Sequence, residues 1–233
     1  MRNLCALFLL LMAPAGQAAN SLMIWPIDPA IASEDKASEL WLENRGSSST
    51  IMQVRIFAWQ QREGQEQYQE QYQTQQQVAA SPPMVRLEPG QKQLVRLIKQ
   101  TPPPAGEESA YRVVLDEIPA PRKPGENQAG LNFQMRYSVP LFIYGSGLTR
   151  DSAKAVLSWR EVSSGGRRWL ELTNSGSGHA RLSNVRAGGT ALGSGLFGYV
   201  LAHSSQRWPV SQPLRGELAA DVNNRAWRST AAR

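Results

Sequence analysis

Apolar side chains occupy every odd position of an eleven-residue stretch, Leu131–Leu141, and every even position except Pro140 is polar. The apolar side chains are those of Leu131, Phe133, Met135, Tyr137, Val139 and Leu141. Because successive side chains of a strand point to opposite faces, this stretch predicts a β-strand with one apolar face. The ordinary explanation is that this face covers the protein's own core.

Two features of this stretch indicate an edge strand that has a partner. It is longer than the five or six residues of a typical strand. Pro140 cannot donate a ladder hydrogen bond and therefore prefers a sheet edge. A long apolar edge strand that is left bare promotes aggregation. We therefore expect another protein to cover it.

The rest of the sequence also alternates mostly with a period of two, and Gly, Pro, Ser and Asn clusters interrupt it about every ten residues. This pattern is typical of an all-β sandwich. In the first half we expect strands at Ser21–Trp25, Ala37–Asn44, Thr50–Gln60, Gln93–Lys99, Tyr111–Ile118 and Asn132–Ile143. In the second half we expect short strands at Ala155–Trp159, Trp169–Leu172, Ala180–Leu182 and Gly198–Leu201.

Three segments between the expected strands have distinct compositions. Glu88-Pro89-Gly90 places Pro and Gly where a tight turn uses them, and Gly188-Gly189 predicts a hairpin turn. The segment Gln60–Gln77 is rich in glutamine and is open to several structures, a disordered loop, a polar edge hairpin or a short helix. We favour an exposed hairpin or loop.

The first residues have the composition of a secretory signal peptide. Arg2 supplies a positive charge, an apolar run covers Leu4–Met12, and small residues follow at Ala18 and Ala19. The run is too short to span a bilayer, so we expect cleavage near residue 19, export to the periplasm and no stable membrane insertion. An uncleaved amphipathic anchor is disfavoured because Pro14 would break its helix.

The mature chain has a length that suits two domains. About 214 residues remain after cleavage, and domains commonly contain about 100. A Gly-Ser-Gly sequence at residues 145–147 resembles a linker, so we expect domains at residues 20–145 and 146–233. The only cysteine, Cys5, lies in the signal peptide, which excludes a disulfide and a cysteine-based metal site from the mature chain.

Charge constrains the partner only weakly. Without Arg2, 24 of the 25 basic residues remain against 19 acidic ones, a net charge of +5. Such a charge suits an acidic protein, a membrane surface or nucleic acid, but export argues against nucleic acid. The basic residues are scattered, so solubility explains the charge equally well.

Few residues could support catalysis. The two histidines, His179 and His203, lie in no metal or nucleophile spacing, and we expect both in loops or at the surface. Asp116 and Glu117 are neighbours on an expected strand and so face opposite sides. No glycine-rich phosphate loop precedes a helix. We expect no enzyme activity, no cofactor and no metal.

Five elements in order carry a family resemblance. They are Trp59, then Pro82–Gly90, then Val95–Leu97, then Tyr111–Pro119, then the alternating strand that ends in Leu141-Phe142-Ile143-Tyr144. Together they resemble the first domain of periplasmic pilus chaperones of the chaperone-usher pathway, and the Tyr111-Arg112 pattern resembles the divergent archaic-type branch. The likeness covers residues 20–145, whereas the second half resembles the family's second domain only loosely.

The resemblance implies two immunoglobulin-like β-sandwich domains set at an angle. It also implies that the strand Leu131–Leu141 is donated to a pilus subunit that lacks a strand of its own, and that the subunit is then delivered to an outer-membrane usher. Pairing of a chaperone with a pilin is a well-known example of β-strand addition, in which ladder bonds give attachment and alternate side chains fill a groove.

The sequence departs from the family at one functional position. Family members usually bind the terminal carboxylate of the subunit with two basic side chains, but the matching positions here are Asp28 and Pro140. Either the register differs by a residue or two, or the anchor has moved. We expect Arg112 to be the substitute, because antiparallel pairing of Tyr111–Ile118 with the donor strand places it near Val139. Arg86 and Arg136 are further candidates, and a solvated surface arginine is the alternative for all three.

Two other protein classes fit parts of the sequence. A secreted adhesive or pilin-like β-sandwich would receive a strand and needs an alternating N-terminal extension. Here Ser21–Ile31 is short and is interrupted by Pro26 and Pro29. A carbohydrate-active enzyme on a sandwich fold would need paired carboxylates in a cleft, which spacing alone does not exclude. The order of the elements favours a strand donor.

Overall fold

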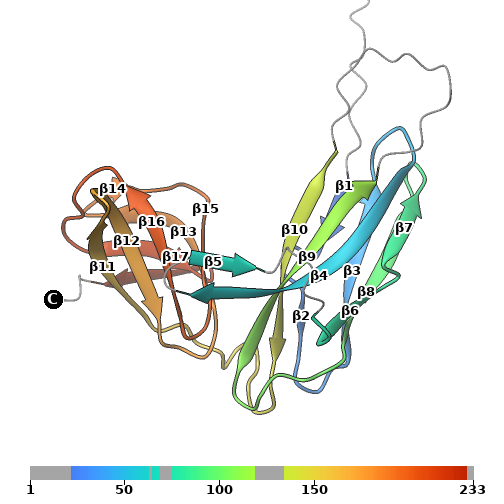
Figure 1. Ribbon diagram of the computed structural model, residues 1–233, viewed down its shortest axis with the longest axis horizontal. Coiled ribbons are helices and arrows are strands. Elements are labelled where there is room, and N and C mark those ends of the chain that lie inside the picture. The colour runs from blue at the N-terminus through green and yellow to red at the C-terminus, as the bar shows by residue number, and fades with distance from the viewer. Residues whose placement is uncertain (1–21, 63–64, 69–74, 119–133, 230–233) are drawn as a thin grey trace, which may run out of the picture.

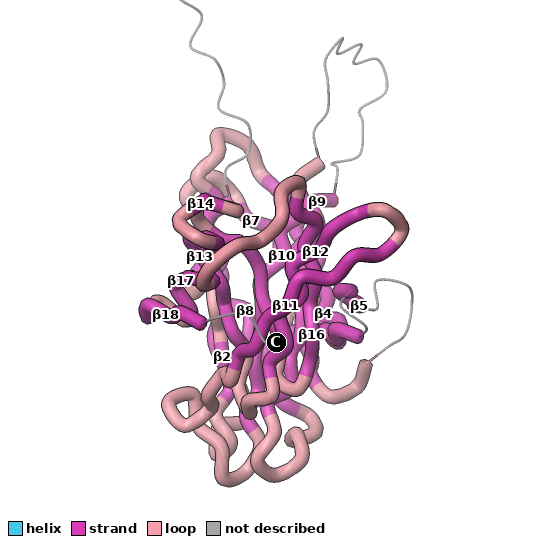
Figure 2. Tube along the Cα trace, turned by 90° about the vertical axis from the view of Figure 1, so that its left-hand side faces the viewer, coloured by secondary structure: helices cyan, strands magenta, loops and turns pink. Residues whose placement is uncertain are grey.

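The computed structural model describes residues 22–62, 65–68, 75–118 and 134–229. Every regular element in these residues is a β-strand (Figure 2), and the strands form two β-sandwich domains that lie side by side at an angle (Figure 1). The all-β prediction is therefore confirmed. No helix in the described part of the chain is long and apolar enough to cross a membrane.

Two sheets face each other in the first domain. The strands of one sheet are, in spatial order, β1 (Leu22–Trp25), β3 (Ala37–Asn44), β8 (Lys92–Lys99) and β6 (Val78–Ser81). The strands of the other are β2 (Ala30–Ile31), β10 (Arg136–Tyr144), β9 (Glu108–Ile118), β4 (Thr50–Arg62) and β5 (Gln65–Tyr68), and β7 (Met84–Leu87) also pairs with β4.

The second domain has a smaller sandwich. One sheet has the order β11 (Leu157–Ser164), β12 (Arg167–Asn174) and β16 (Ser204–Val210). The other has the order β14 (Thr190–Ala191), β13 (Ala180–Ala187), β17 (Leu218–Val222) and β18 (Arg225–Ser229), and β15 (Leu196–Val200) pairs with β13. The Gly-Ser-Gly segment at residues 145–147 lies between β10 and β11.

Alternating side chains build the core of each domain. In the first domain, strands β3, β8, β9 and β10 contribute every second residue to one buried cluster, for example Val113 and Leu115 on β9. In the second domain, Leu170 and Leu172 of β12 pack with Leu182 and Val185 of β13. The period of two in the sequence therefore reports these cores correctly.

Both predicted turns are confirmed. The Gln91 N–H donates to the Glu88 carbonyl at 2.9 Å, and Gly90 has a φ of 77°. Pro89 followed by a residue at positive φ is the arrangement of a type II turn. Gly188 and Gly189 both have positive φ, 52° and 86°, and join β13 to β14. Two positive φ values are what a type I′ hairpin requires.

A buried asparagine ends one strand in each domain. Asn44 ends β3 and Asn174 ends β12, and both are fully buried. In each case the Oδ1 atom accepts from the backbone N–H two residues later, and Nδ2 donates to the carbonyl four residues later. A buried amide needs such partners. An asparagine therefore stabilises the same kind of chain reversal at the end of one strand in each domain.

Two predicted segments differ from the structure. The strand expected from Asn132 to Ile143 appears among the described residues as β10, which begins at Arg136, and Asn132 and Phe133 lie outside them. The glutamine-rich segment begins as a hairpin, with β4 continuing to Arg62 and pairing with β5. This hairpin reaches toward the second domain (Figure 1), and Gln61 is only 5 % exposed, so the expectation of an exposed segment is wrong for this residue.

Candidate functional site

The outer edge of β10 is open over most of its length. On one side β10 pairs with β9 from Arg136 to Tyr144. On the other side, among the described strands, only β2 pairs with it, at Phe142 and Ile143. Figure 1 shows β10 at the side of its sheet, next to the short β2. The segment from Arg136 to Leu141 is therefore an edge strand.

The direction of the backbone groups follows from two hydrogen bonds. Glu117 N–H donates to the Met135 carbonyl at 3.0 Å, so the odd residues of β10 bond to β9. Phe142 N–H donates outward to the Pro29 carbonyl at 3.3 Å. Because antiparallel ladder bonds alternate, the backbone groups of Arg136 and Ser138 also face outward. Pro140 lies in this outward-facing set, where a missing N–H is tolerated.

The predicted apolar face divides into two parts. Val139 is 6 % exposed and Leu141 is fully buried, and both belong to the core of their own domain. Tyr137 is half-buried against that core, and Met135 is 44 % exposed just before the strand begins. Leu131 and Phe133 lie outside the described residues. For Val139 and Leu141, the core explanation therefore holds.

A third apolar cluster fills the cleft between the domains. Its buried members are Trp59, Phe142, Tyr144, Leu148, Tyr199 and Leu201. Trp59 meets Tyr199 edge to face, with ring centroids 5.3 Å apart. The two domains are thus packed together through aromatic rings.

Arg112 lies in this cleft, on the face of the sheet that points away from the domain core. Its neighbours across the ladder are Pro140 on β10 and Phe57 on β4. The guanidinium carbon lies 3.5 Å from the centroid of the Trp59 ring and 5.6 Å from that of Tyr199. These distances are those of cation–π contacts. The predicted strand pairing is confirmed, because Val139 pairs with Val113.

The other two anchor candidates form ion pairs elsewhere. Arg86 lies on β7 and contacts Glu88 at 2.8 Å, with 66 % of its side chain exposed. Arg136 contacts Asp116 at 2.5 Å. Asp28 pairs with Arg150. The structure brings neither Arg86 nor Arg136 next to the aromatic cluster.

Asp116 holds two arginines on the same sheet face as Arg112. It accepts from Arg55 at 2.6 Å and from Arg136 at 2.5 Å. Partial burial raises the pKa of Asp116, but hydrogen bonds and charge from the two arginines outweigh burial, and the net pKa is lowered. Glu117 faces the other way and accepts from Thr50 at 3.0 Å, as expected for neighbours on a strand.

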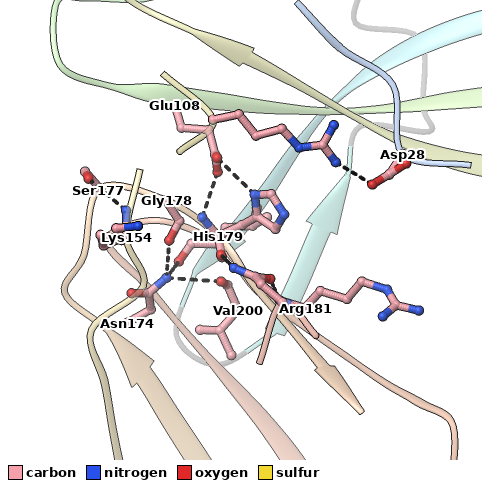
Figure 3. A network of polar contacts seen from close by, with 12 residues as sticks. Asp28, Glu108, Lys154, Asn174, Ser177, Gly178, His179, Arg181 and Val200 are labelled. Atoms are coloured by element: carbon pink, nitrogen blue, oxygen red, sulfur yellow. Dashed lines mark hydrogen bonds and ion pairs between the residues drawn. The ribbon is translucent and has the colours of Figure 1, made fainter. Parts of the chain in front are cut away.

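Polar contacts also join the domains. Both carboxylate oxygens of Glu108 lie 2.9 Å from His179, one from the backbone N–H and one from ring Nδ1 (Figure 3). The His179 ring stacks on Phe142, with centroids 3.5 Å apart. Burial raises the pKa of Tyr144, and the nearby Glu108 charge raises it further. His179 lies in a loop as expected, but its ring takes part in the domain contact.

Gln61 joins the domains through its side-chain amide. Nε2 donates to the Tyr199 carbonyl at 2.9 Å, and Oε1 accepts from the Leu201 N–H at 2.8 Å. Gln61 is two residues after Trp59, so both side chains lie on the same face of β4, and both contact Tyr199. The position of Tyr199 over Arg112 therefore depends on Gln61.

Replacing Gln61 with alanine should loosen the contact between the domains. The substitution leaves the Tyr199 carbonyl and the Leu201 N–H unsatisfied, which costs about 1–3 kcal/mol. Hydrogen exchange of the Leu201 amide measures this loss directly, at about tenfold faster exchange per 1.4 kcal/mol. Gln60→Ala is the matched control because Gln60 is exposed. Equal exchange in both variants would refute the role of Gln61.

The contacts of Gln61, Glu108 and His179 escaped prediction from the sequence. Each joins residues far apart in the chain, 138 positions for Gln61 and Tyr199. Gln61 lies in a segment where glutamine is common, so composition does not distinguish it. One local signal exists, since Gln61 stands two residues after Trp59 and must share its face of a strand.

Comparison with known proteins agrees with this architecture. Residues 30–149 match the family model described as the pili and flagellar-assembly chaperone, PapD N-terminal domain. No curated protein matches the chain. Among solved structures, the chain is similar to the chaperone in a CsuC–CsuE chaperone–tip adhesion subunit pre-assembly complex from archaic Csu pili of Acinetobacter baumannii. Identity is 33 %, coverage is 90 % of this chain and 96 % of the other, and the TM-score is 0.73.

More distant structures share the fold. The E. coli chaperone DraB has 16 % identity and a TM-score of 0.65, covering 91 % of this chain and 97 % of its own. The CupB2 chaperone of Pseudomonas aeruginosa has 18 % identity and a TM-score of 0.59, covering 89 % and 97 %. The family consists of chaperones and not of enzymes. With its first domain matched and its architecture shared over nine-tenths of its length, this chain belongs to the PapD-like family of pilus assembly chaperones.

Proposed function

We propose that this protein is a periplasmic chaperone that holds a pilus subunit by adding strand β10 to it and then delivers the subunit to an outer-membrane usher. The observation that carries the proposal is the open outer edge of β10 from Arg136 to Leu141. A subunit strand that pairs with this edge gains ladder bonds without any requirement on its sequence.

Side chains at the start of the donor strand supply the apolar part of the interaction. Met135 is 44 % exposed in the free protein and Tyr137 is half-buried, whereas Val139 and Leu141 already serve the chaperone's own core. By the alternation of the sequence, Leu131 and Phe133 continue the same face. Leu131, Phe133 and Met135, at about 1.5–3 kcal/mol each when fully buried, give about 4.5–9 kcal/mol before the costs of association, and the accessible part of Tyr137 adds to this.

Arg112 is the anchor that we propose for the terminal carboxylate of the subunit. It lies in the cleft and pairs across the ladder with Pro140, the position that the family resemblance matches to a cation. A guanidinium offers five donors in a plane, which suits a carboxylate. Arg86 and Arg136 are weaker candidates because both are paired with carboxylates away from the aromatic cluster.

The cellular setting belongs to the same proposal. The relative with 33 % identity comes from an archaic chaperone-usher pathway, and its structure contains a tip subunit. This supports pilus subunits as partners and an archaic-type pathway. Cleavage of the signal peptide near residue 19 and domains at residues 20–145 and 146–233 complete the proposal.

Co-purification tests strand donation. The exported, tagged protein is co-expressed with the pilus subunit of its own host, and a stoichiometric complex is expected. Met135→Arg should abolish recovery of the subunit, because a charge would enter the subunit's apolar groove. Met84→Arg is the matched control, since Met84 is 52 % exposed on β7 and lies away from β10. Recovery that is unchanged in Met135→Arg would refute donation.

A further inference from the structure

The indole N–H of Trp59 is a buried donor without an acceptor. Trp59 is 2 % exposed, and within the described residues its Nε1 atom has no hydrogen-bond partner. It is the only buried side-chain polar atom of the described residues in this condition. Buried donors are satisfied in nearly all native proteins, so an orphaned one calls for an explanation, and a ligand is one.

The orphaned donor lies beside a positive charge. The Arg112 guanidinium carbon lies over the Trp59 ring, 3.5 Å from its centroid, which is a cation–π contact. Both groups carry their N–H bonds in their planes and point them outward at their edges. A contact through the ring face does not use the indole N–H, so the Trp59 donor lies beside the guanidinium without donating to it.

The surroundings keep the pair in place, and a hollow lies beside Trp59. Tyr199 covers the guanidinium from the second domain at 5.6 Å and packs against Trp59 at 5.3 Å. Gln61 fixes the backbone of Tyr199. Trp59 also lines a hollow of about 640 Å³ with Gln61, Tyr111 and Leu201. Residues of both domains thus hold Trp59 and Arg112 together, and the hollow borders the Trp59 side of the pair.

We infer that Trp59 Nε1–H is the second donor of a carboxylate site whose first donor is Arg112. One carboxylate oxygen accepts from the guanidinium and the other accepts from the indole. This inference rests on the proposed function, in which the ligand is the C-terminal carboxylate of a subunit. It explains how the chain binds a carboxylate although Asp28 and Pro140 stand where the family has cations.

A titration followed by NMR tests the inference on the free protein. The probe is N-acetyl-glycyl-glycine, and its C-terminal amide is the control. The seven tryptophans give resolvable indole signals in a ¹H–¹⁵N spectrum. The signal that is missing in Trp59→Phe is that of Trp59. If Trp59→Phe fails to fold, single phenylalanine substitutions of the other six tryptophans assign their signals and leave that of Trp59.

The expected result is a saturable downfield shift of the Trp59 indole signal with the acid and not with the amide. The shift should disappear in Arg112→Ala. Trp59→Phe should weaken binding of the subunit about tenfold, the effect of one hydrogen bond to a charged group. A Trp59 signal that stays in place at saturating probe overturns the inference. Failure of strand donation would appear separately, as loss of the Met135 effect in co-purification.

Discussion

Arg112→Ala is expected to abolish recovery of the subunit while leaving the chaperone folded. Truncating one partner of a desolvated charge pair costs about 2–5 kcal/mol, or roughly 30-fold to several thousand-fold in affinity. The chaperone should remain folded, because Arg112 contacts the rings of Trp59 and Tyr199 from the cleft and belongs to neither domain core. Co-purification measures the loss, and circular dichroism with thermal unfolding checks the fold.

Two substitutions separate the anchor from a general effect of charge. Arg112→Lys keeps the charge but loses the planar donors and the stacking on Trp59, so only partial recovery is expected. Arg86→Ala removes an arginine that is exposed and paired with Glu88, and it should have no effect. Loss of the subunit in Arg86→Ala or Arg136→Ala, with full recovery in Arg112→Ala, would assign the anchor to a different arginine.

The strands and turns of this protein are predictable because their causes are local. Alternation along β9 places Val113 and Leu115 in the core whatever surrounds them. Pro89 and Gly90 fix a turn through their own backbone preferences. The position of Arg112 was predictable for a related reason, since antiparallel pairing of two neighbouring strands determines which residues lie opposite each other.

The cleft is less predictable because its contacts join the two domains. The pairing of Glu108 with His179 spans 71 positions and depends on how the sandwiches pack, which no local pattern encodes. A repeated sequence motif could have predicted the two strand ends that a buried asparagine forms. Leu42-Glu43-Asn44-Arg45-Gly46 and Leu172-Thr173-Asn174-Ser175-Gly176 share Leu, Asn and Gly at the same spacing, and each ends a strand with a buried amide. This repeat marks corresponding positions in the two domains.

Leu141→Ala is expected to destabilise the free chaperone strongly, whereas Met135→Ala should not. Leu141 is fully buried in the core of the first domain, so its truncation should lower the free energy of unfolding by about 2–5 kcal/mol. Met135 is 44 % exposed and precedes the strand, so its truncation should change stability by less than about 0.5 kcal/mol. Urea unfolding of the free proteins measures both values.

For binding of the subunit, Met135→Ala should have a larger effect than Leu141→Ala. Comparison of stability with binding shows which side chains of the alternating strand pack in the chaperone's core and which pack in the subunit. Leu141→Ala should keep the subunit wherever the chaperone is folded, because its side chain faces the chaperone's own core. Met135→Ala should weaken the complex by about 1–3 kcal/mol, the burial energy of its side chain. Equal destabilisation of the free protein by both substitutions would mean that the whole strand belongs to the chaperone's core. The expected split instead means that the first half of the alternating strand is available to a partner, while Val139 and Leu141 in its second half hold the strand in the chaperone's own core.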